Sequence, residues 1–335
     1  MSDFPTAERL DTVAYLQREA KRLVARRTPL PDDLTHLAER VASFRRAFAE
    51  LLGPCAPEGV PLNPRTVACV DADEGIVVEK VYFDSAADWS CPALLYRPRE
   101  DRGPAPAVVV VHGWGHTKLN MNPFKYALAQ AGYIALIVDN PFAGEHQSRV
   151  RDGDEYQYGS MPLATCVGLT MMGLGVRDIR RAADYLQSRE DVAQDRLGIA
   201  GLCWGGMQTW AAAALDERFR VIVPVCSTST YEALLCDYAS YARHTCLGTY
   251  PPGLLRHGDF QDIAACCAPR PVLVMNNIND DWFPIAGLHA LATELRAVYA
   301  HLGAADRFEV HLQDTVHDIT PDFTRRAIEW FDRHL

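Results

Sequence analysis

Cys203 stands at the centre of a stretch in which residue types and spacing point to nucleophilic chemistry. A short apolar run, Leu197 to Ala200, is followed by the letters GLCWGG over residues 201–206 and then by the helix-forming segment Met207 to Leu215. Glycines two positions before and after a central residue permit the sharp strand-to-helix turn that exposes a catalytic side chain. Such a turn aims the backbone N–H of Trp204 at a developing oxyanion. We predict that Cys203 is a nucleophile; the alternative is a small buried core residue, as most free cysteines are.

A nucleophile of this kind needs a general base, and the base needs an acid that orients it. Asp280 and Asp281 follow directly after the apolar run PVLVM, and His317 lies between the last predicted strand and the last predicted helix. The chain order nucleophile, acid, histidine fits a triad of Cys203, Asp280 and His317. Only one of two adjacent loop carboxylates can meet the imidazole, and we favour Asp280 over Asp281. For His311, within a predicted strand, we expect a structural role.

A second oxyanion donor is expected in the loop after the apolar run Ala107 to Val111. That loop reads HGWGH over residues 112–116, which makes the backbone N–H of Trp114 the natural donor. We expect His112 to hold this loop by hydrogen bonds rather than to act as a base. The alternative is that the glycines serve only a tight turn.

The elements that would position these residues alternate between strands and helices. An antiparallel pair, Ile76 to Phe83 and Pro92 to Arg97, is expected first. Further strands are predicted at Ala107–Val111, Tyr133–Val138, Leu197–Ala200, Val221–Val225, Val272–Met275 and Phe308–Leu312, and helices at Pro123–Ala131, Val176–Ser188, Met207–Leu215, Ile285–Leu302 and Pro321–His334. This alternation indicates an α/β fold, with a mostly parallel sheet that helices cover on both faces.

Residues 1–65 are predicted to form a helical N-terminal extension, and residues 66–335 the catalytic domain. Two apolar stripes at helical spacing lie before Gly53, and each must bury against the main domain or against a second subunit. A homodimer through the N-terminal helices is therefore one expectation.

Two long excursions, residues 140–175 and 226–269, interrupt the alternation. Both leave strand ends on the side where open α/β sheets bind ligands, so we expect lids or pocket walls there. From this location alone we predict substrate contacts for Glu145, His146, Arg149 and Tyr158.

The composition argues against several kinds of partner. A formal charge of −10 over 335 residues disfavours nucleic acid and anionic membranes. The ten cysteines include no CxxC pair and no Cys/His cluster of the zinc type, and we expect neither a metal nor a cofactor. The N-terminus shows no secretory signal, and no apolar run approaches membrane-spanning length. A small-molecule substrate and a reducing cytoplasm are the expected setting.

The segments from about Val77 onward resemble the dienelactone hydrolase and acetyl xylan esterase branch of the α/β-hydrolases. The segments that carry the resemblance are VEKVYFDS, LLYRP, VVVVHGWG, DNPFAGEH, VRDIRRAADYLQSREDVAQDRLGIAGLCWGG, ALDERFRVIVPVC, PRPVLVMNNINDDWFP and the closing His-Asp loop. The resemblance implies the α/β-hydrolase fold, with Asp280 at the family's acid position and His317 at its base position. Glu145 and His146 stand where the family usually has small residues. No arginine matches the one with which dienelactone hydrolase-like enzymes bind a substrate carboxylate.

Cysteine at position 203 departs from the acetyl xylan esterases, which carry serine there, and agrees with dienelactone hydrolase and the bile-acid acyltransferase relatives. A thiolate beside an imidazolium is strongly nucleophilic, and the thioester it forms passes its acyl group readily to water, amines and thiols. We therefore expect a hydrolase of an ester, a lactone or a thioester rather than a simple carbohydrate deacetylase. An acyltransferase with the same triad is the first alternative, and a non-hydrolytic member that keeps only the fold is the second.

Overall fold

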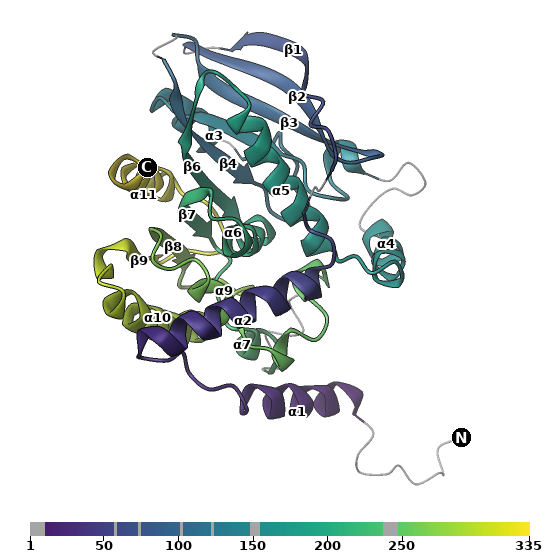
Figure 1. Ribbon diagram of the computed structural model, residues 1–335, viewed down its shortest axis with the longest axis vertical. Coiled ribbons are helices and arrows are strands. Elements are labelled where there is room, and N and C mark those ends of the chain that lie inside the picture. The colour runs from purple at the N-terminus through teal and green to yellow at the C-terminus, as the bar shows by residue number, and fades with distance from the viewer. Residues whose placement is uncertain are drawn as a thin grey trace.

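A nine-stranded sheet runs through the molecule in the order β1-β2-β3-β5-β4-β6-β7-β8-β9 (Figure 1). The computed structural model describes residues 11–56, 59–72, 75–100, 103–121, 124–147, 155–236 and 247–335. Pairing is antiparallel from β1 to β5 and parallel from β5 to β9. The strands are β1 (Arg65–Ala72), β2 (Ile76–Ala86), β3 (Trp89–Pro98), β4 (Ala105–Val111), β5 (Ile134–Val138), β6 (Val192–Leu202), β7 (Phe219–Val225), β8 (Val272–Asn277) and β9 (Phe308–Gln313). The predicted α/β-hydrolase fold is confirmed.

Helices cover both faces of the sheet, as the alternation predicts. The α-helices are α1 (Thr12–Val24), α2 (Leu34–Leu52), α3 (Phe124–Gln130), α4 (Glu155–Cys166), α5 (Met171–Gln187), α6 (Trp204–Leu215), α7 (Tyr231–Cys236), α9 (Phe260–Ala265), α10 (Ile285–His301) and α11 (Pro321–His334). Every predicted strand and helix has a counterpart among them. The helices α4, α7 and α9 were not predicted; all three lie within the two excursions and are short.

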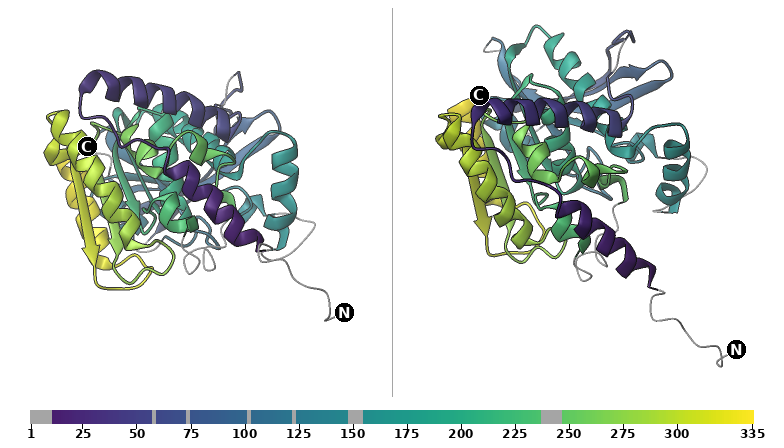
Figure 2. Two further views of the ribbon diagram at one scale, coloured as in Figure 1. Left: turned by 90° about the horizontal axis from the view of Figure 1, so that it is seen from below. Right: turned by 60° about the horizontal axis from the view of Figure 1, so that its bottom comes forward.

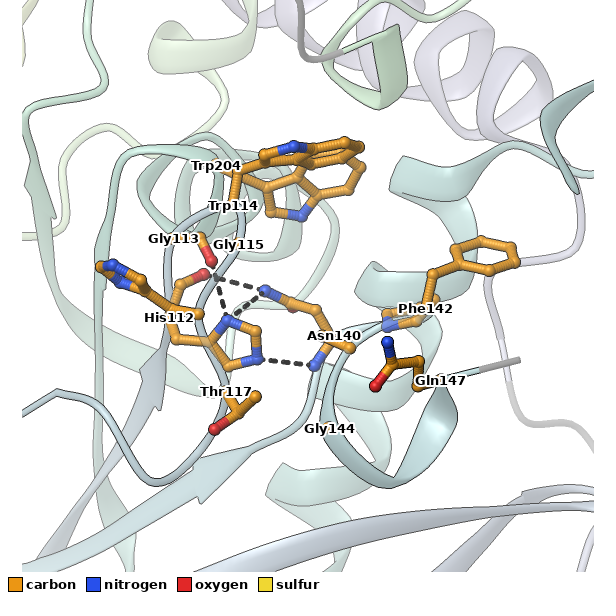
Figure 3. A pocket seen from close by; sticks show the side chains of 13 residues that line it. His112, Gly113, Trp114, Gly115, Thr117, Asn140, Phe142, Gly144, Gln147 and Trp204 are labelled. Atoms are coloured by element: carbon orange, nitrogen blue, oxygen red, sulfur yellow. Dashed lines mark hydrogen bonds between the residues drawn. The ribbon is translucent and has the colours of Figure 1, made fainter. Parts of the chain in front are cut away.

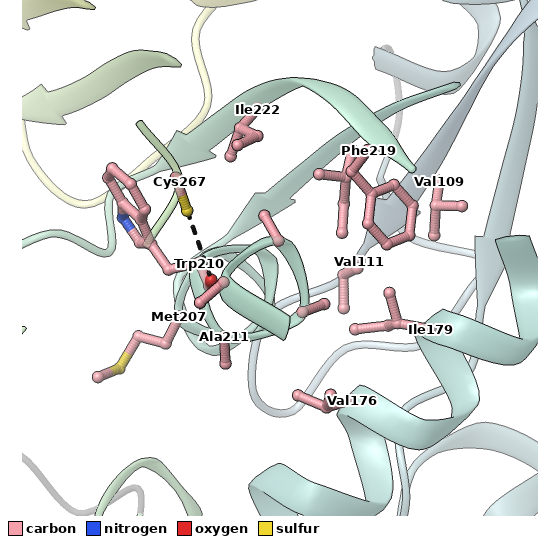
Figure 4. Packing of buried hydrophobic residues seen from close by; sticks show 14 of the residues in the cluster. Val109, Val111, Val176, Ile179, Met207, Trp210, Ala211, Phe219, Ile222 and Cys267 are labelled. Atoms are coloured by element: carbon pink, nitrogen blue, oxygen red, sulfur yellow. Dashed lines mark hydrogen bonds between the residues drawn. The ribbon is translucent and has the colours of Figure 1, made fainter. Parts of the chain in front are cut away.

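The alternation of side chains in the central strands divides the core into two layers. Val109 and Val111 of β4 pack on one face with α5, α6, α9 and α10, as Figure 4 shows for the first two helices. Val108 and Val110 point to the other face, where α3 and α11 cover them. Burying β-branched side chains on both faces is what favours a central parallel strand. The catalytic elements therefore rest on a rigid base.

The two N-terminal helices differ in how they pack. Helix α2 buries Leu37, Phe44, Phe48 and Leu52 in the main core and lies along the outside of the molecule (Figure 2). Helix α1 contacts α7, yet it buries no residue fully and leaves Tyr15 and Leu16 more than half exposed. Packing on the main domain thus accounts for α2. The homodimer stays a prediction.

Within the described residues, no helix combines the length and the apolar character that crossing a membrane requires.

Candidate active site

Cys203 occupies the turn between β6 and α6, where the sequence pattern places it. Its backbone has φ 56° and ψ −120°, a conformation that is rare for a residue with a side chain. The strain is held in place by hydrogen bonds on both sides: Cys203 N–H donates to the Val225 carbonyl at 2.9 Å, and Met207 N–H donates to the Cys203 carbonyl at 3.0 Å. Strained residues of this kind gather at functional sites.

Two glycines let this turn form. A Cβ atom on Gly201 would lie 2.3 Å from the Gly205 carbonyl oxygen, and one on Gly205 would lie 2.2 Å from the Val111 carbonyl oxygen. Neither position has room for a side chain. The close backbone packing between β4, β6 and α6 therefore requires the two glycines at this spacing around Cys203.

Asp280 and His317 meet at the carboxyl ends of β8 and β9. His317 Nδ1 lies 2.8 Å from Asp280 Oδ2, and the Asp280 side chain is fully buried while 21% of the His317 side chain is exposed. The other carboxylate oxygen of Asp280 accepts the backbone N–H groups of Trp282 (2.8 Å) and Phe283 (3.2 Å). Asp281 is exposed. The structure therefore brings Asp280, and not Asp281, to the imidazole.

The surroundings of His317 favour its protonated form. Burial alone lowers its pKa, but the interactions with Asp280 and with Cys203 outweigh burial and raise the pKa to about 10. Because Nδ1 faces Asp280, Nε2 is the nitrogen not engaged by that carboxylate. The ring of Phe283 stacks on the imidazole, with centroids 5.9 Å apart, which fixes the orientation of the imidazole.

Asn277, the last residue of β8, holds the loop that carries His317. Its Nδ2 donates to the carbonyls on either side of that histidine, Val316 at 2.6 Å and Asp318 at 2.9 Å. The same amide nitrogen lies 3.1 Å from Sγ of Cys226. One buried side chain thereby fixes the backbone immediately before and after His317.

Cys226 is a second thiol close to His317 and Asp280. It follows the last residue of β7, is fully buried, and its Sγ donates to the Asp318 carbonyl at 3.3 Å. This sulfur, a ring nitrogen of His317 and a carboxylate oxygen of Asp280 all lie within 4.8 Å of one another. Burial and the nearby Asp280 carboxylate raise the pKa of Cys226 well above its ordinary value. Cys226 is thus a neutral thiol and a poor nucleophile.

The loop after β4 lies against the cysteine. A Cβ atom on Gly113 would lie 3.3 Å from Cys203 Cβ, and the indoles of Trp114 and Trp204 pack with centroids 4.8 Å apart. The backbone N–H of Trp204 belongs to the first turn of α6, where N–H groups have no intrahelical acceptor. Within the described chain, the backbone N–H of Trp114 donates to no backbone carbonyl. Both predicted oxyanion donors therefore border Cys203.

His112 ties this loop to the end of β5 (Figure 3). Its Nε2 accepts the Asn140 backbone N–H at 3.0 Å, which leaves Nδ1–H to donate to the Gly113 carbonyl at 2.9 Å. Asn140 Nδ2 in turn donates to the His112 carbonyl at 2.8 Å. Burial lowers the pKa of His112 to about 4, so the ring stays neutral. The expected structural role of His112 fits these bonds.

A pocket of about 140 Å³ opens between the loop after β4 and the loop after β5. Its lining comprises His112, Gly113, Trp114, Gly115, His116, Thr117, Asn140, Pro141, Phe142, Ala143, Gly144, Gln147 and Trp204. Figure 3 shows the two packed indoles of Trp114 and Trp204 on one side of this space and Phe142 on another. The first excursion thus supplies one wall of the pocket, as expected.

Of the residues in the first excursion that are predicted to contact substrate, the structure describes the side chains of Glu145 and His146, and both bind other parts of the protein. Glu145 forms ion pairs with Lys118 Nζ (2.7 Å) and Lys80 Nζ (3.1 Å), and His146 Nε2 lies 2.8 Å from the Ser90 carbonyl. Their substrate contacts stay predictions. Arg149 lies outside the described residues, and Tyr158 belongs to α4 with its side chain outside the description.

Sequence reasoning missed Asn277, Asn140 and Phe142. The available signal was position: Asn277 and Asn140 each end or follow a predicted strand on the side of the sheet that carries the elbow. Phe142 has φ 68°, which no feature of the sequence indicates for a phenylalanine.

The chain matches family models across the described site. The model of the Dienelactone hydrolase family matches residues 91–232, and that of the Prolyl oligopeptidase family matches residues 170–335. The chain is 30% identical over 307 residues to "Putative hydrolase YtaP" of Bacillus subtilis (strain 168), which covers 88% of this chain and 99% of that protein. It is 29% identical over 170 residues to "Putative carboxymethylenebutenolidase" of Escherichia coli (strain K12), over 50% of this chain and 58% of that protein.

Solved structures share the fold at lower identity. Methylesterase BT1017 superposes with a TM-score of 0.73 at 20% identity, over 94% of this chain and 68% of that chain. The acetyl xylan esterase from Paenibacillus sp. R4 gives 0.64 at 18%, over 99% of this chain and 97% of that chain. The match to YtaP over nearly its whole length and the family model that spans the elbow agree: the chain belongs to the α/β-hydrolase superfamily, in its dienelactone hydrolase-like branch, and is an ester or lactone hydrolase.

Proposed function

We propose that this hydrolase cleaves its ester or lactone through a covalent acyl-cysteine intermediate on Cys203. The observation that carries the proposal is the contact of His317 Nδ1 with Asp280 Oδ2 at 2.8 Å. Cys203 lies on the strained turn before α6 and is one of the groups that raise the pKa of His317. A cysteine at the N-terminus of a helix and beside an imidazolium is the environment in which a thiol gives a reactive thiolate. The N-terminus of α6 starts directly after Cys203.

In the acylation step, the Cys203 thiolate attacks the carbonyl carbon and a C–S bond forms. The electron pair of the carbonyl moves to oxygen, which the backbone N–H groups of Trp114 and Trp204 stabilise. Collapse of this intermediate breaks the C–O bond of the ester. Nε2–H of His317 gives its proton to the departing alkoxide, which leaves a thioester and a neutral imidazole.

In the deacylation step, the neutral imidazole of His317 takes a proton from water as the water attacks the thioester. The thiolate no longer exists at this stage, so one of the interactions that raise the pKa of His317 is gone. The imidazole is then a base rather than a fixed cation. Breaking the C–S bond releases the acid and restores the thiolate–imidazolium pair, with Asp280 orienting the ring throughout.

Intact-mass analysis with a panel of aryl esters, lactones and acyl thioesters tests the proposal. We expect a single acyl adduct that maps to Cys203 and that disappears in Cys203→Ala together with turnover. Cys226→Ala is the matched control, because it removes the neighbouring thiol and should keep the adduct. Turnover by Cys203→Ala at the wild-type rate, or an adduct that maps to Cys226, would overturn the proposal.

The acceptor of the acyl group is measured in the same experiment. We expect the free acid as the product, since water is the acceptor in a hydrolase. Adding an amine or a thiol and analysing the products separates hydrolysis from the acyltransferase alternative, in which the amide or thioester would dominate.

A further inference from the structure

The pocket lies next to the turn that carries Cys203, and Cys203 itself does not line it. Its lining includes Gly113, Trp114 and Trp204, which border Cys203, but it includes neither His317 nor Asp280. A tetrahedral intermediate on Cys203 points its oxyanion at the two backbone donors and its leaving oxygen at His317, which protonates it. The remaining substituent is the acyl chain. The pocket is therefore placed to receive the acyl chain and not the leaving group.

Gly113 both lines the pocket and borders Cys203. A Cβ atom there would lie 3.3 Å from Cys203 Cβ, 3.4 Å from the Leu202 carbonyl oxygen and 3.7 Å from His116 Nδ1. A side chain at this position would therefore take up space between Cys203 and the pocket. Glycine at residue 113 leaves that space to an acyl group on Cys203.

Apart from His112 and His116, the described residues that line the pocket carry no ionisable side chain, and several of them are aromatic. Among the described residues, its lining contains no Asp, Glu, Lys or Arg. The nearby charges of Lys118, Asp139 and Glu145 are paired with one another behind the loop. The ring of His112 is neutral because burial lowers its pKa to about 4. A charged group entering this space would lose its hydration, and among the described lining residues it would meet no Asp, Glu, Lys or Arg with which to pair.

The walls and the volume favour a flat ring. The rings of Trp114 and Trp204 pack together at an interplanar angle of 35°, and Phe142, Met161 and Met171 complete the apolar cluster to which they belong. Trp204 is held from behind, since a Cβ atom on Gly248 would lie 1.9 Å from its ring. A cavity of roughly 150 Å³ with apolar walls holds a benzene molecule, and this pocket measures about 140 Å³.

We propose that this pocket binds an uncharged, phenyl-sized aromatic acyl group, so that the enzyme prefers aryl or arylalkyl carboxylic esters over acetyl esters and over acyl groups that carry a carboxylate. The inference rests on the proposed function, because it places the acyl chain on Cys203. It goes beyond that function by naming the substrate class.

Trifluoroethyl esters test the inference, since their leaving group is constant and not aromatic. We expect kcat/KM for trifluoroethyl phenylacetate to exceed that for trifluoroethyl acetate by about tenfold or more, the scale of a modest apolar contact. A carboxylate at the para position of the ring should remove most of that gain. Phe142→Ala, and independently Trp114→Leu, which keeps its backbone N–H, should each reduce the phenylacetyl-to-acetyl ratio by about tenfold. Tyr15→Ala, an exposed aromatic on α1, is the control that should leave the ratio unchanged.

Other outcomes overturn the inference in distinguishable ways. Equal or faster turnover of the acetyl ester, or a ratio that both pocket variants leave unchanged, contradicts the acyl pocket. If Phe142→Ala lowers turnover of phenyl acetate more than that of trifluoroethyl phenylacetate, the ring belongs to the leaving group. Acylation of Cys203 in all these cases keeps the proposed function intact. The absence of any Cys203 adduct with every ester refutes the proposed function instead.

Discussion

Asp280 meets His317 through one oxygen of its carboxylate, while the other oxygen is fixed by the backbone that follows it. Oδ2 lies 2.8 Å from Nδ1 of the imidazole, and Oδ1 accepts the N–H groups of Trp282 and Phe283. These two backbone N–H groups therefore orient the carboxylate independently of the histidine. This arrangement also explains why the neighbouring Asp281, which is exposed, does not take its place.

The pair of adjacent aspartates offers a matched comparison. Asp280→Asn should lower kcat/KM by about 100-fold or more, because an amide cannot support the imidazolium and favours the wrong tautomer. Asp281→Asn should change kcat/KM by no more than about threefold, as expected of an exposed side chain. Steady-state kinetics on both variants, with unfolding curves to confirm that each is folded, makes the comparison. A larger loss in Asp281→Asn than in Asp280→Asn would contradict the assignment.

Asn277 should act as a positioning residue for His317. Asn277→Ala removes the donor to the carbonyls of Val316 and Asp318, so we expect it to cost about 2 kcal/mol of unfolding free energy and to lower kcat more than it raises KM. Asn276→Ala is the matched control: Asn276 is equally buried, but its Nδ2 donates to Thr228 instead, at 3.2 Å. It should cost similar stability while kcat stays within a few-fold. Equal losses of kcat in the two variants would show that Asn277 contributes to stability but does not position His317.

The elbow and its partners could be predicted because their requirements are local. A Cβ atom at Gly201 or Gly205 would collide with the backbone, so the turn requires glycine at both positions. The sequence shows this requirement as the spacing of the two glycines. Asp280 and His317 follow strands whose apolar runs are unmistakable, so their loops could be placed at one edge of a parallel sheet. From the sequence we favour Asp280 over Asp281, and in the structure Asp280 is the carboxylate that contacts His317.

The acyl pocket could not be predicted because it depends on contacts between distant segments. His112 and Asn140 are far apart in sequence, and their hydrogen bonds, with the ion pairs of Lys118 to Asp139 and Glu145, bring the loops after β4 and β5 together. The conformation of the second loop depends on Gly144, where a Cβ would lie 2.2 Å from an Asp139 carboxylate oxygen. The sequence shows a glycine there but not the buried carboxylate that it must accommodate.

The raised pKa of His317 predicts a specific pH dependence. The folded pKa of about 10 exceeds the ordinary value of 6.5. A group whose pKa is raised by folding stabilises the protein fully below pH 6.5, and this contribution is lost as pH rises through 10. The difference in unfolding free energy between wild type and His317→Gln should therefore shrink between pH 6.5 and 10. Denaturant unfolding at a series of pH values measures the difference.

Nuclear magnetic resonance titration checks the same group directly. The imidazole signal that His317→Gln removes should titrate well above pH 6.5 in the wild type. In Cys203→Ala its midpoint should move down, because the hydrogen bond and charge of the cysteine are gone. A wild-type midpoint near 6.5 would contradict the ion pair on which the proposed mechanism depends.

Gly113→Ala should separate activity from stability. The added Cβ would sit 3.3 Å from Cys203 Cβ, a tight contact that a shift of a few tenths of an ångström relieves. We expect a cost of about 1 kcal/mol in unfolding free energy, typical of mild overpacking. The methyl group would nevertheless take up space between Cys203 and the pocket, so kcat/KM for arylalkyl esters should fall by about tenfold or more. An active, aryl-selective Gly113→Ala enzyme would show that the acyl group takes another route.

Glu145 offers a test between anchoring the loop after β5 and contacting substrate. Burial raises the pKa of Glu145, but Lys118, Tyr82 and Lys80 outweigh burial and lower the pKa to about 2. The ionised carboxylate therefore stabilises the folded protein above its ordinary pKa of 4.5, and this contribution is lost as pH falls toward 2. Glu145→Gln should therefore cost about 1 kcal/mol at neutral pH, since this pair is partly exposed, and the deficit should disappear in acid. Glu217→Gln, whose partner Arg45 it meets at 3.0 Å on the surface, should cost less. A change in KM without any change in unfolding free energy would instead favour the predicted substrate contact.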